Sequence, residues 1–224
     1  MVAIDWYGVR ERIGALARRD EAKGVFGAWS GSHGHRFQLA PPLTELQLRQ
    51  AEEQFRVALP EDYRGFLLQV GAGGAGPAYG IAPLQCPDGV WRWGQPGEDT
   101  DPTRLQQPFP AQEVIAAAWA EIDARRPTAG DFADPEEYGR ALHAWDAEEE
   151  LLFDQFTVGA ICLCHEGCGT FDWLVVSGPE RGTVWFDDRA ADQGLTPVGK
   201  NSGRVNFSEW YLGWLQAAEA KVNG

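Results

Sequence analysis

The feature that most constrains the fold is the stretch TFDWLVVSGPERGTVWFDD, residues 170–188. Two runs of β-branched and aromatic residues flank GPERG, a turn signal, so this stretch predicts two antiparallel strands joined by a tight turn. Alternation along the first run divides its side chains between two faces of the strand. One face carries Phe171, Trp173 and Val175, and the other carries Asp172, Leu174 and Val176. Similar patterns at about 157–164 and 195–198 predict further strands beside these two.

Helical patterns lie on both sides of this strand cluster. They cover residues 4–19, a segment that begins at Thr44, the segment from Pro60 to Gly71, about 111–125, about 135–153, and a closing segment within 205–222. Thr44 and Gln47 have the spacing of a capping box. Residues 85–110 are rich in Pro, Gly, Asp and Gln, and they predict a loop.

Helices first, antiparallel strands later and a terminal helix predict an α+β fold, with a mainly antiparallel sheet packed by helices. We expect a single domain over residues 1–224. Its core blocks would be about 41–84 and 157–216, and about 85–155 would be a helical, acidic insertion.

Composition places the chain among globular proteins, because 44% of its residues are hydrophobic and ten are tryptophan. No apolar run approaches the length of a membrane span. Acids and arginines interrupt the N-terminal helix pattern, which does not resemble a signal peptide. We therefore expect a cytoplasmic protein with no membrane partner.

The charge is unevenly distributed. The formal net charge is −14, and residues 85–156, with 16 acidic and 5 basic residues, contribute −11 of it. Such a segment would be repelled by phosphates, so direct binding to nucleic acid is not expected. The segment suits a basic protein partner, and plain solubility is the alternative explanation.

Cysteines and a histidine crowd into residues 162–168. Cys162, Cys164, His165 and Cys168, with Cys86, could bind a metal, but their spacing is not a usual zinc pattern. Strand alternation would place Cys162 and Cys164 on one face as small buried side chains. No neighbour in the sequence would orient His165 toward Cys168 for nucleophilic catalysis. We expect no metal, no cofactor and no enzymatic activity, although an enzyme that uses this cluster is a third alternative.

Three stretches together resemble the SUKH superfamily, the Smi/Knr-like proteins. The first, residues 41–84, contains LPEDYRGFL, a Gly-rich loop and YGIAPL. The second is HEGCGTFDWLVVSGPERGTVWFDD, and the third is the closing FSEWYLGWL. The recurring family residues here would serve the architecture: Leu59, Pro60, Tyr63, Tyr79, Gly167, Cys168, Gly169, Gly178 and Trp185. Gly167 and Gly169 fit a tight turn that needs a positive φ.

The resemblance implies a non-catalytic domain. Many bacterial members are immunity proteins that neutralise a toxin, often a nuclease, whereas fungal relatives are regulatory scaffolds. We therefore expect an immunity protein that binds a cognate polymorphic toxin, basic and nucleolytic, and occludes its active site. The alternative is a regulatory or scaffold module of the same fold.

Carboxylates beside aromatic residues are the expected contact surface, because aromatic anchors supply affinity and charge sets the association rate. The alternative is that Trp91 and Trp93 cover the core. The candidate toxin-binding residues are Trp91, Trp93, Glu98, Asp99, Asp101, Glu166, Asp187 and Asp188.

Overall fold

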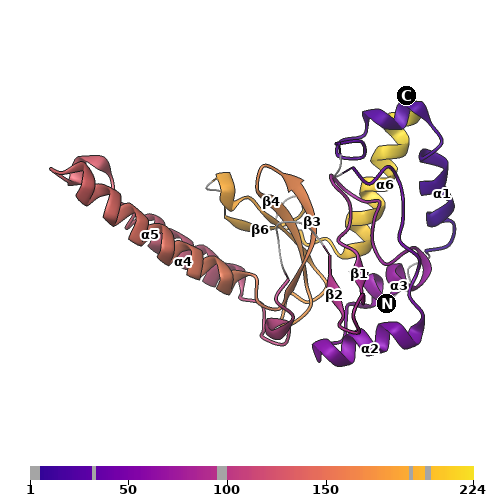
Figure 1. The fold of residues 1–224 in the computed structure, drawn as a ribbon, viewed down its shortest axis with the longest axis horizontal. Coiled ribbons are helices and arrows are strands. Elements are labelled where there is room, and N and C mark those ends of the chain that lie inside the picture. Colours follow the sequence, from indigo (N-terminus) through magenta and orange to yellow (C-terminus); the bar gives the residue numbers. More distant parts are fainter. Residues whose placement is uncertain (1–5, 32–33, 95–99, 192–193, 200–202) are drawn as a thin grey trace.

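The centre of the molecule is a four-stranded antiparallel sheet in the order β3-β4-β5-β6 (Figure 1). The computed structural model describes residues 6–31, 34–94, 100–191, 194–199 and 203–224. The strands are β3 (Ala160–Gly167), β4 (Thr170–Val175), β5 (Val184–Asp187) and β6 (Leu195–Pro197). Each strand pairs with the next one along the chain, and Trp173 of β4 lies opposite Trp185 of β5.

Six α-helices and a small second sheet complete the described part of the chain. The helices are α1 (Val9–Leu16), α2 (Glu45–Phe55), α3 (Glu61–Gln69), α4 (Gln112–Asp123), α5 (Pro135–Phe156) and α6 (Phe207–Asn223). The second sheet pairs β1 (Leu84–Gln85) with β2 (Arg92–Trp93). Four short 3-10 helices are η1 (Asp20–Gly24), η2 (Pro102–Arg104), η3 (Ala129–Asp131) and η4 (Arg189–Ala191). The predicted α+β class is confirmed.

Local sequence signals fix several helix ends. The Thr44 hydroxyl accepts a hydrogen bond from the Gln47 N–H at 3.2 Å, and the Gln47 side chain accepts one from the Thr44 N–H at 2.9 Å. This confirms the predicted capping box at α2. Asn206 and Glu209 form the same arrangement at the start of α6. Helix α1 begins later than predicted, because Gly8 has a left-handed φ of 74°.

The two faces of the four-stranded sheet bury different cores. Leu163 and Leu174 belong to the larger core, which they share with α1, α2, α3 and α6. Cys162 and Trp173 belong to a smaller core on the opposite face, where the start of α4 and the end of α5 cover them. The predicted alternation along β4 is therefore confirmed.

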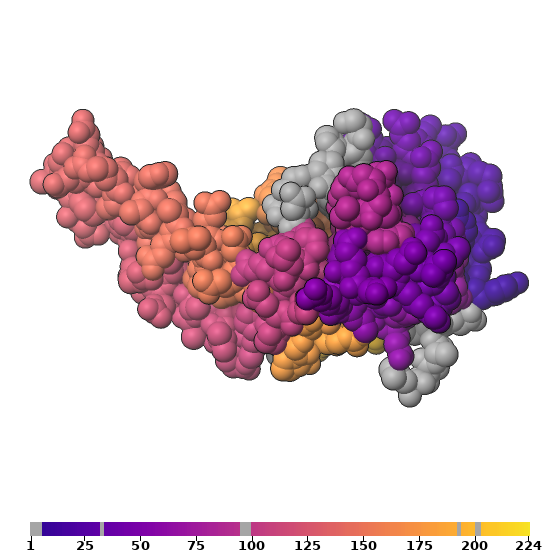
Figure 2. Space-filling model, turned by 60° about the horizontal axis from the view of Figure 1, so that its bottom comes forward, coloured from indigo at the N-terminus to yellow at the C-terminus, as the bar shows by residue number. Residues whose placement is uncertain are grey.

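Helices α4 and α5 form an antiparallel hairpin that stands away from the rest of the molecule (Figures 1 and 2). The Trp119 and Phe153 rings stack between the two helices, with 5.0 Å between their centroids. Nearer the tip, the Trp145 indole N–H donates to the Ile122 carbonyl at 2.8 Å. The hairpin is thus internally packed, and only its base touches the sheet. That about 85–155 is an insertion stays a prediction.

Within the predicted loop, residues 85–110, the structure contains β2 and η2. None of the helices in the described ranges is long and apolar enough to cross a membrane.

Candidate interaction surface

A buried ion pair at the end of β5 lies against the base of the hairpin. The Asp187 carboxylate on β5 is fully buried and accepts hydrogen bonds from the Arg189 guanidinium, one of them from Nε at 2.7 Å. The Trp173 indole N–H also donates to Asp187, at 3.1 Å. The same guanidinium lies 4.5 Å from the centroid of the Phe153 ring on α5. One arginine therefore links the end of the inner strand β5 to the hairpin.

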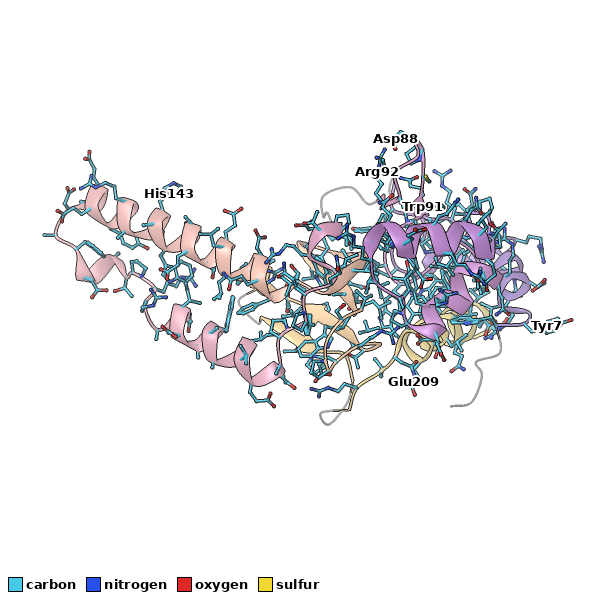
Figure 3. The ribbon with its side chains drawn as sticks, turned by 90° about the horizontal axis from the view of Figure 1, so that it is seen from below. Tyr7, Asp88, Trp91, Arg92, His143 and Glu209 are labelled. Atoms are coloured by element: carbon cyan, nitrogen blue, oxygen red, sulfur yellow. The ribbon has the colours of Figure 1, made fainter. Side chains whose placement is uncertain are left out.

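The hairpin carries most of the negative charge of the protein. Residues 112–156 contain twelve acidic and three basic residues, a formal charge of −9 out of −14. Most of these acidic side chains are exposed. Figure 3 shows the outer side of α5, where His143 points away from α4. Because the hairpin projects from the domain, its charges act on an approaching partner with little cancellation by the body.

An apolar groove interrupts this acidic surface. It has a volume of about 340 Å³ and lies between the two helices. Its lining includes Ala118 and Ile122 from α4 and Leu151 and Leu152 from α5. Leu151 is 65% exposed, and Val114, one turn before Ala118, is 58% exposed. Large aliphatic side chains with such exposure indicate contact surfaces when they lie together.

An ion pair crosses the groove. The Arg125 guanidinium donates two hydrogen bonds to the Glu148 carboxylate, at 2.8 and 3.0 Å. This contact raises the pKa of Arg125 and lowers the pKa of Glu148. Both side chains are about half exposed, so the pair defines the geometry of the groove more than it stabilises the fold.

The aromatic candidates from the sequence are not on this surface. Trp91 and Trp93 are both buried, which fits the alternative that they cover the core, and their role in binding stays a prediction. The Gln54 side chain on α2 binds the backbone N–H and carbonyl of Trp91, at 2.8 and 2.7 Å. The Trp93 ring stacks on Phe55 at 4.6 Å, and its N–H donates to the Tyr63 hydroxyl at 3.0 Å. Both tryptophans therefore serve the core in this structure.

The structure does not bring the acidic candidate residues together on one surface of the described part of the chain. Glu98 and Asp99 lie outside the described residues. Asp101 is exposed and caps η2 by accepting from the Thr103 N–H. Asp187 is buried in its ion pair and cannot meet a partner without breaking it, whereas Glu166 and Asp188 are half-buried. Their role in binding stays a prediction.

The cysteine-rich stretch does not assemble as the sequence suggested. Irregular pairing between Cys162 and Cys164 shifts the register, so the two thiols point to opposite faces of the sheet. The expectation that both share one face is wrong, because a bulge adds a residue and reverses the alternation. His165 stacks on Phe171 at 4.8 Å, and Cys168 is exposed in the turn.

A different trio comes together instead. One atom each from Cys164, Glu166 and Asp172 lie within 4.8 Å of one another, which makes them possible metal ligands within the described ranges. The Cys164 thiol donates to Glu166 at 3.2 Å, and the Trp210 N–H of α6 donates to Asp172 at 3.2 Å. The sequence contained no signal for this trio, because the bulge and a distant helix create it.

Burial, together with the Glu166 carboxylate, raises the pKa of Asp172 well above its usual range. Burial likewise raises the pKa of the Cys164 thiol, and the Asp172 and Glu166 carboxylates add to the effect. A protonated thiol is a poor nucleophile. The trio therefore acts as a hydrogen-bonded contact between the sheet and α6.

His35 is buried, and its Nδ1 accepts from the Phe37 N–H at 2.9 Å. Burial lowers the pKa of His35 to about 4. The ring is therefore neutral at pH 7.

A larger open groove, of about 1150 Å³, lies on the body beside the starts of α3 and α6. Three arginines contribute to its lining, but each is bound within the protein. Arg64 pairs with Glu52, Arg204 pairs with Glu180, and Arg181 donates to the Ala58 and Leu59 carbonyls. Since the guanidinium groups already have partners, the groove is not a ready-made anion site.

The four-stranded sheet, helices α2 to α5 and the Gly-Cys-Gly turn all lie in the segment that matches a known family. Residues 42–204 match the SMI1 / KNR4 family (SUKH-1). The chain belongs to this family. The resemblance to this family is confirmed, and the SUKH-1 match covers nearly all of the first core block, the hairpin and the second core block up to residue 204. Neither the curated proteins nor the solved structures include a match to the chain.

Proposed function

We propose that this SUKH-1 protein is an immunity protein that binds a cognate toxin and occludes its active site. The observation that carries the proposal is the acidic hairpin, which holds a charge of −9 on a projecting arm of a family domain. Family membership supports the immunity class, because SUKH proteins are generally immunity proteins rather than enzymes.

A basic nuclease is the toxin that best fits this charge. A nuclease needs a positively charged cleft to hold the phosphates of its substrate. An acidic arm is complementary to such a cleft, and occupying the cleft would exclude nucleic acid. Complementary charge also speeds association, so a small amount of toxin would be captured quickly in the cytoplasm.

The protein would act by binding and not by catalysis. Its buried thiol is held protonated, and Asp172 and Glu166 are engaged with that thiol and with each other. These contacts hold all three side chains within the protein, which supports a structural role for the trio.

Co-expression in a sensitive bacterium tests the proposal. The product of the neighbouring gene would be induced with and without this protein, and growth would be followed. Restored growth supports immunity. Toxicity that the protein does not relieve would refute the proposal and favour a regulatory or scaffold role.

A further inference from the structure

The hairpin groove has the form of a docking site for a helix. Ala118 and Ile122 line the groove, and the exposed Val114, four residues before Ala118, extends their stripe beyond the groove toward the start of α4. Leu151 and Leu152 form the opposite wall on α5. The stripe from Val114 to Arg125 is about 16 Å long at 1.5 Å per residue, which matches roughly three turns of a partner helix.

The negative charge around the groove limits which kind of partner can bind there. Glu121 and the Arg125–Glu148 pair border the apolar floor, and the surrounding hairpin is strongly acidic. A second copy of this chain, with a formal charge of −14, would be repelled. A helix with leucine-like side chains on one face and lysine or arginine on its flanks would bury the floor and pair with the rim.

We infer that the hairpin groove binds a basic amphipathic helix of the partner protein, which packs across α4 and α5 as the third helix of a bundle. The inference rests on the proposed function for the identity of the partner as a toxin, but the groove and its charge define the chemistry of the contact. Leu151 and Val114 would be the apolar contacts, and the acidic rim would orient the incoming helix.

A synthetic peptide provides the probe. It would be a basic amphipathic helix of about 18 residues, with leucines on one face and lysines on the flanks. A second peptide would have the same composition in scrambled order, so that it has the same charge but no apolar face. We expect the chain to bind the amphipathic peptide at least about tenfold more tightly than the scrambled one, measured by calorimetry.

The chain contains closely matched control positions. Leu151 is 65% exposed and Leu46 on α2 is 66% exposed, whereas Val114 is 58% and Val90 is 50% exposed. The double variant Leu151→Gln/Val114→Gln should lose the preference for the amphipathic peptide. The double variant Leu46→Gln/Val90→Gln removes similar apolar side chains elsewhere and should keep it. Circular dichroism would establish that both variants are folded.

Two results with the peptides would overturn the inference, and the growth assay provides a third. One is an equal affinity of the chain for the two peptides, and the other is a preference that persists in the Leu151→Gln/Val114→Gln variant. The growth assay separates the inference from the proposed function. If that variant still protects cells, the groove is not the docking site although immunity stands. If the unaltered protein gives no protection, the proposed function fails, and the peptide result alone decides the inference.

Discussion

At the scale of single residues, burial decides which carboxylates can serve recognition. Asp187 is the clearest case, because it was a candidate binding residue beside an aromatic residue, yet its carboxylate is fully buried against Arg189 and Trp173. Asp172 is nearly as buried, but its neighbours are a thiol and another carboxylate. Two buried aspartates therefore have opposite electrostatic environments.

Asp172 should make the protein less stable as the pH rises. Its pKa is raised in the folded state by burial and by Glu166, so the folded protein binds a proton that the unfolded chain releases above its ordinary value of 3.8. Stability is then lost between this value and the raised pKa. The variant Asp172→Asn mimics the protonated group. At pH 8 its free energy of unfolding should exceed that of the unaltered protein by about 1 kcal/mol or more. Urea unfolding at pH 5 and pH 8 would measure this.

The control for this prediction is Asp88→Asn. Asp88 is exposed, and its hydrogen bonds to Arg92 lower its pKa, so the replacement should give no stabilisation at high pH. If Asp172→Asn proved less stable than the unaltered protein at pH 8, the carboxylate would be needed in its charged form.

Arg189 should be the residue on which the attachment of the hairpin depends most. Replacing it by alanine leaves the Asp187 carboxylate buried without its cation, and removes a guanidinium from the Phe153 ring. We expect Arg189→Ala to cost roughly 3 kcal/mol in urea unfolding. Arg92→Ala breaks an exposed pair with Asp88 and should leave the unfolding midpoint close to that of the unaltered protein. Similar midpoints for the two variants would contradict this role.

At the scale of elements, local sequence patterns were sufficient to predict a helix or its start wherever the contacts that determine it are close in sequence. The capping box at Thr44, the buried stripe of α3 and the two long helices of the hairpin all follow from spacing within one segment. Helical periodicity indicates which side of a helix is buried, and capping residues indicate where the helix starts.

Long-range contacts account for the elements and sites that the sequence did not predict. Trp91 is held by a Gln54 side chain from a different helix, so neither its burial nor β2 can be read from the loop-like composition around it. The shift after Cys162 depends on how β3 meets β4. The hairpin helices were predicted, but their exposed groove was not, because the exposure of Leu151 depends on how far α4 covers α5.

At the scale of the whole molecule, charge and shape act together. The body and the hairpin lie at opposite ends of the long axis (Figure 1), so the acidic groups of the hairpin are far from most of the basic residues, which belong to the body. A basic protein that approaches from this side would be attracted first by the negative charge of the hairpin. Long-range steering of this kind changes the association rate more than the dissociation rate, and salt screens it.

Neutralising the arm should therefore slow binding to a basic toxin. The triple variant Glu137→Gln/Asp146→Asn/Glu150→Gln removes three exposed charges from α5, and the rate of association at about 0.02 M salt should fall several-fold. The variant Glu11→Gln/Glu53→Gln/Glu61→Gln removes three exposed charges from the body and should have a smaller effect. Stopped-flow measurements at about 0.02 and 0.5 M salt would compare them. Because screening suppresses steering, the rates should converge at high salt. Equal slowing by both variants at low salt would mean that total charge, and not the hairpin, governs the encounter.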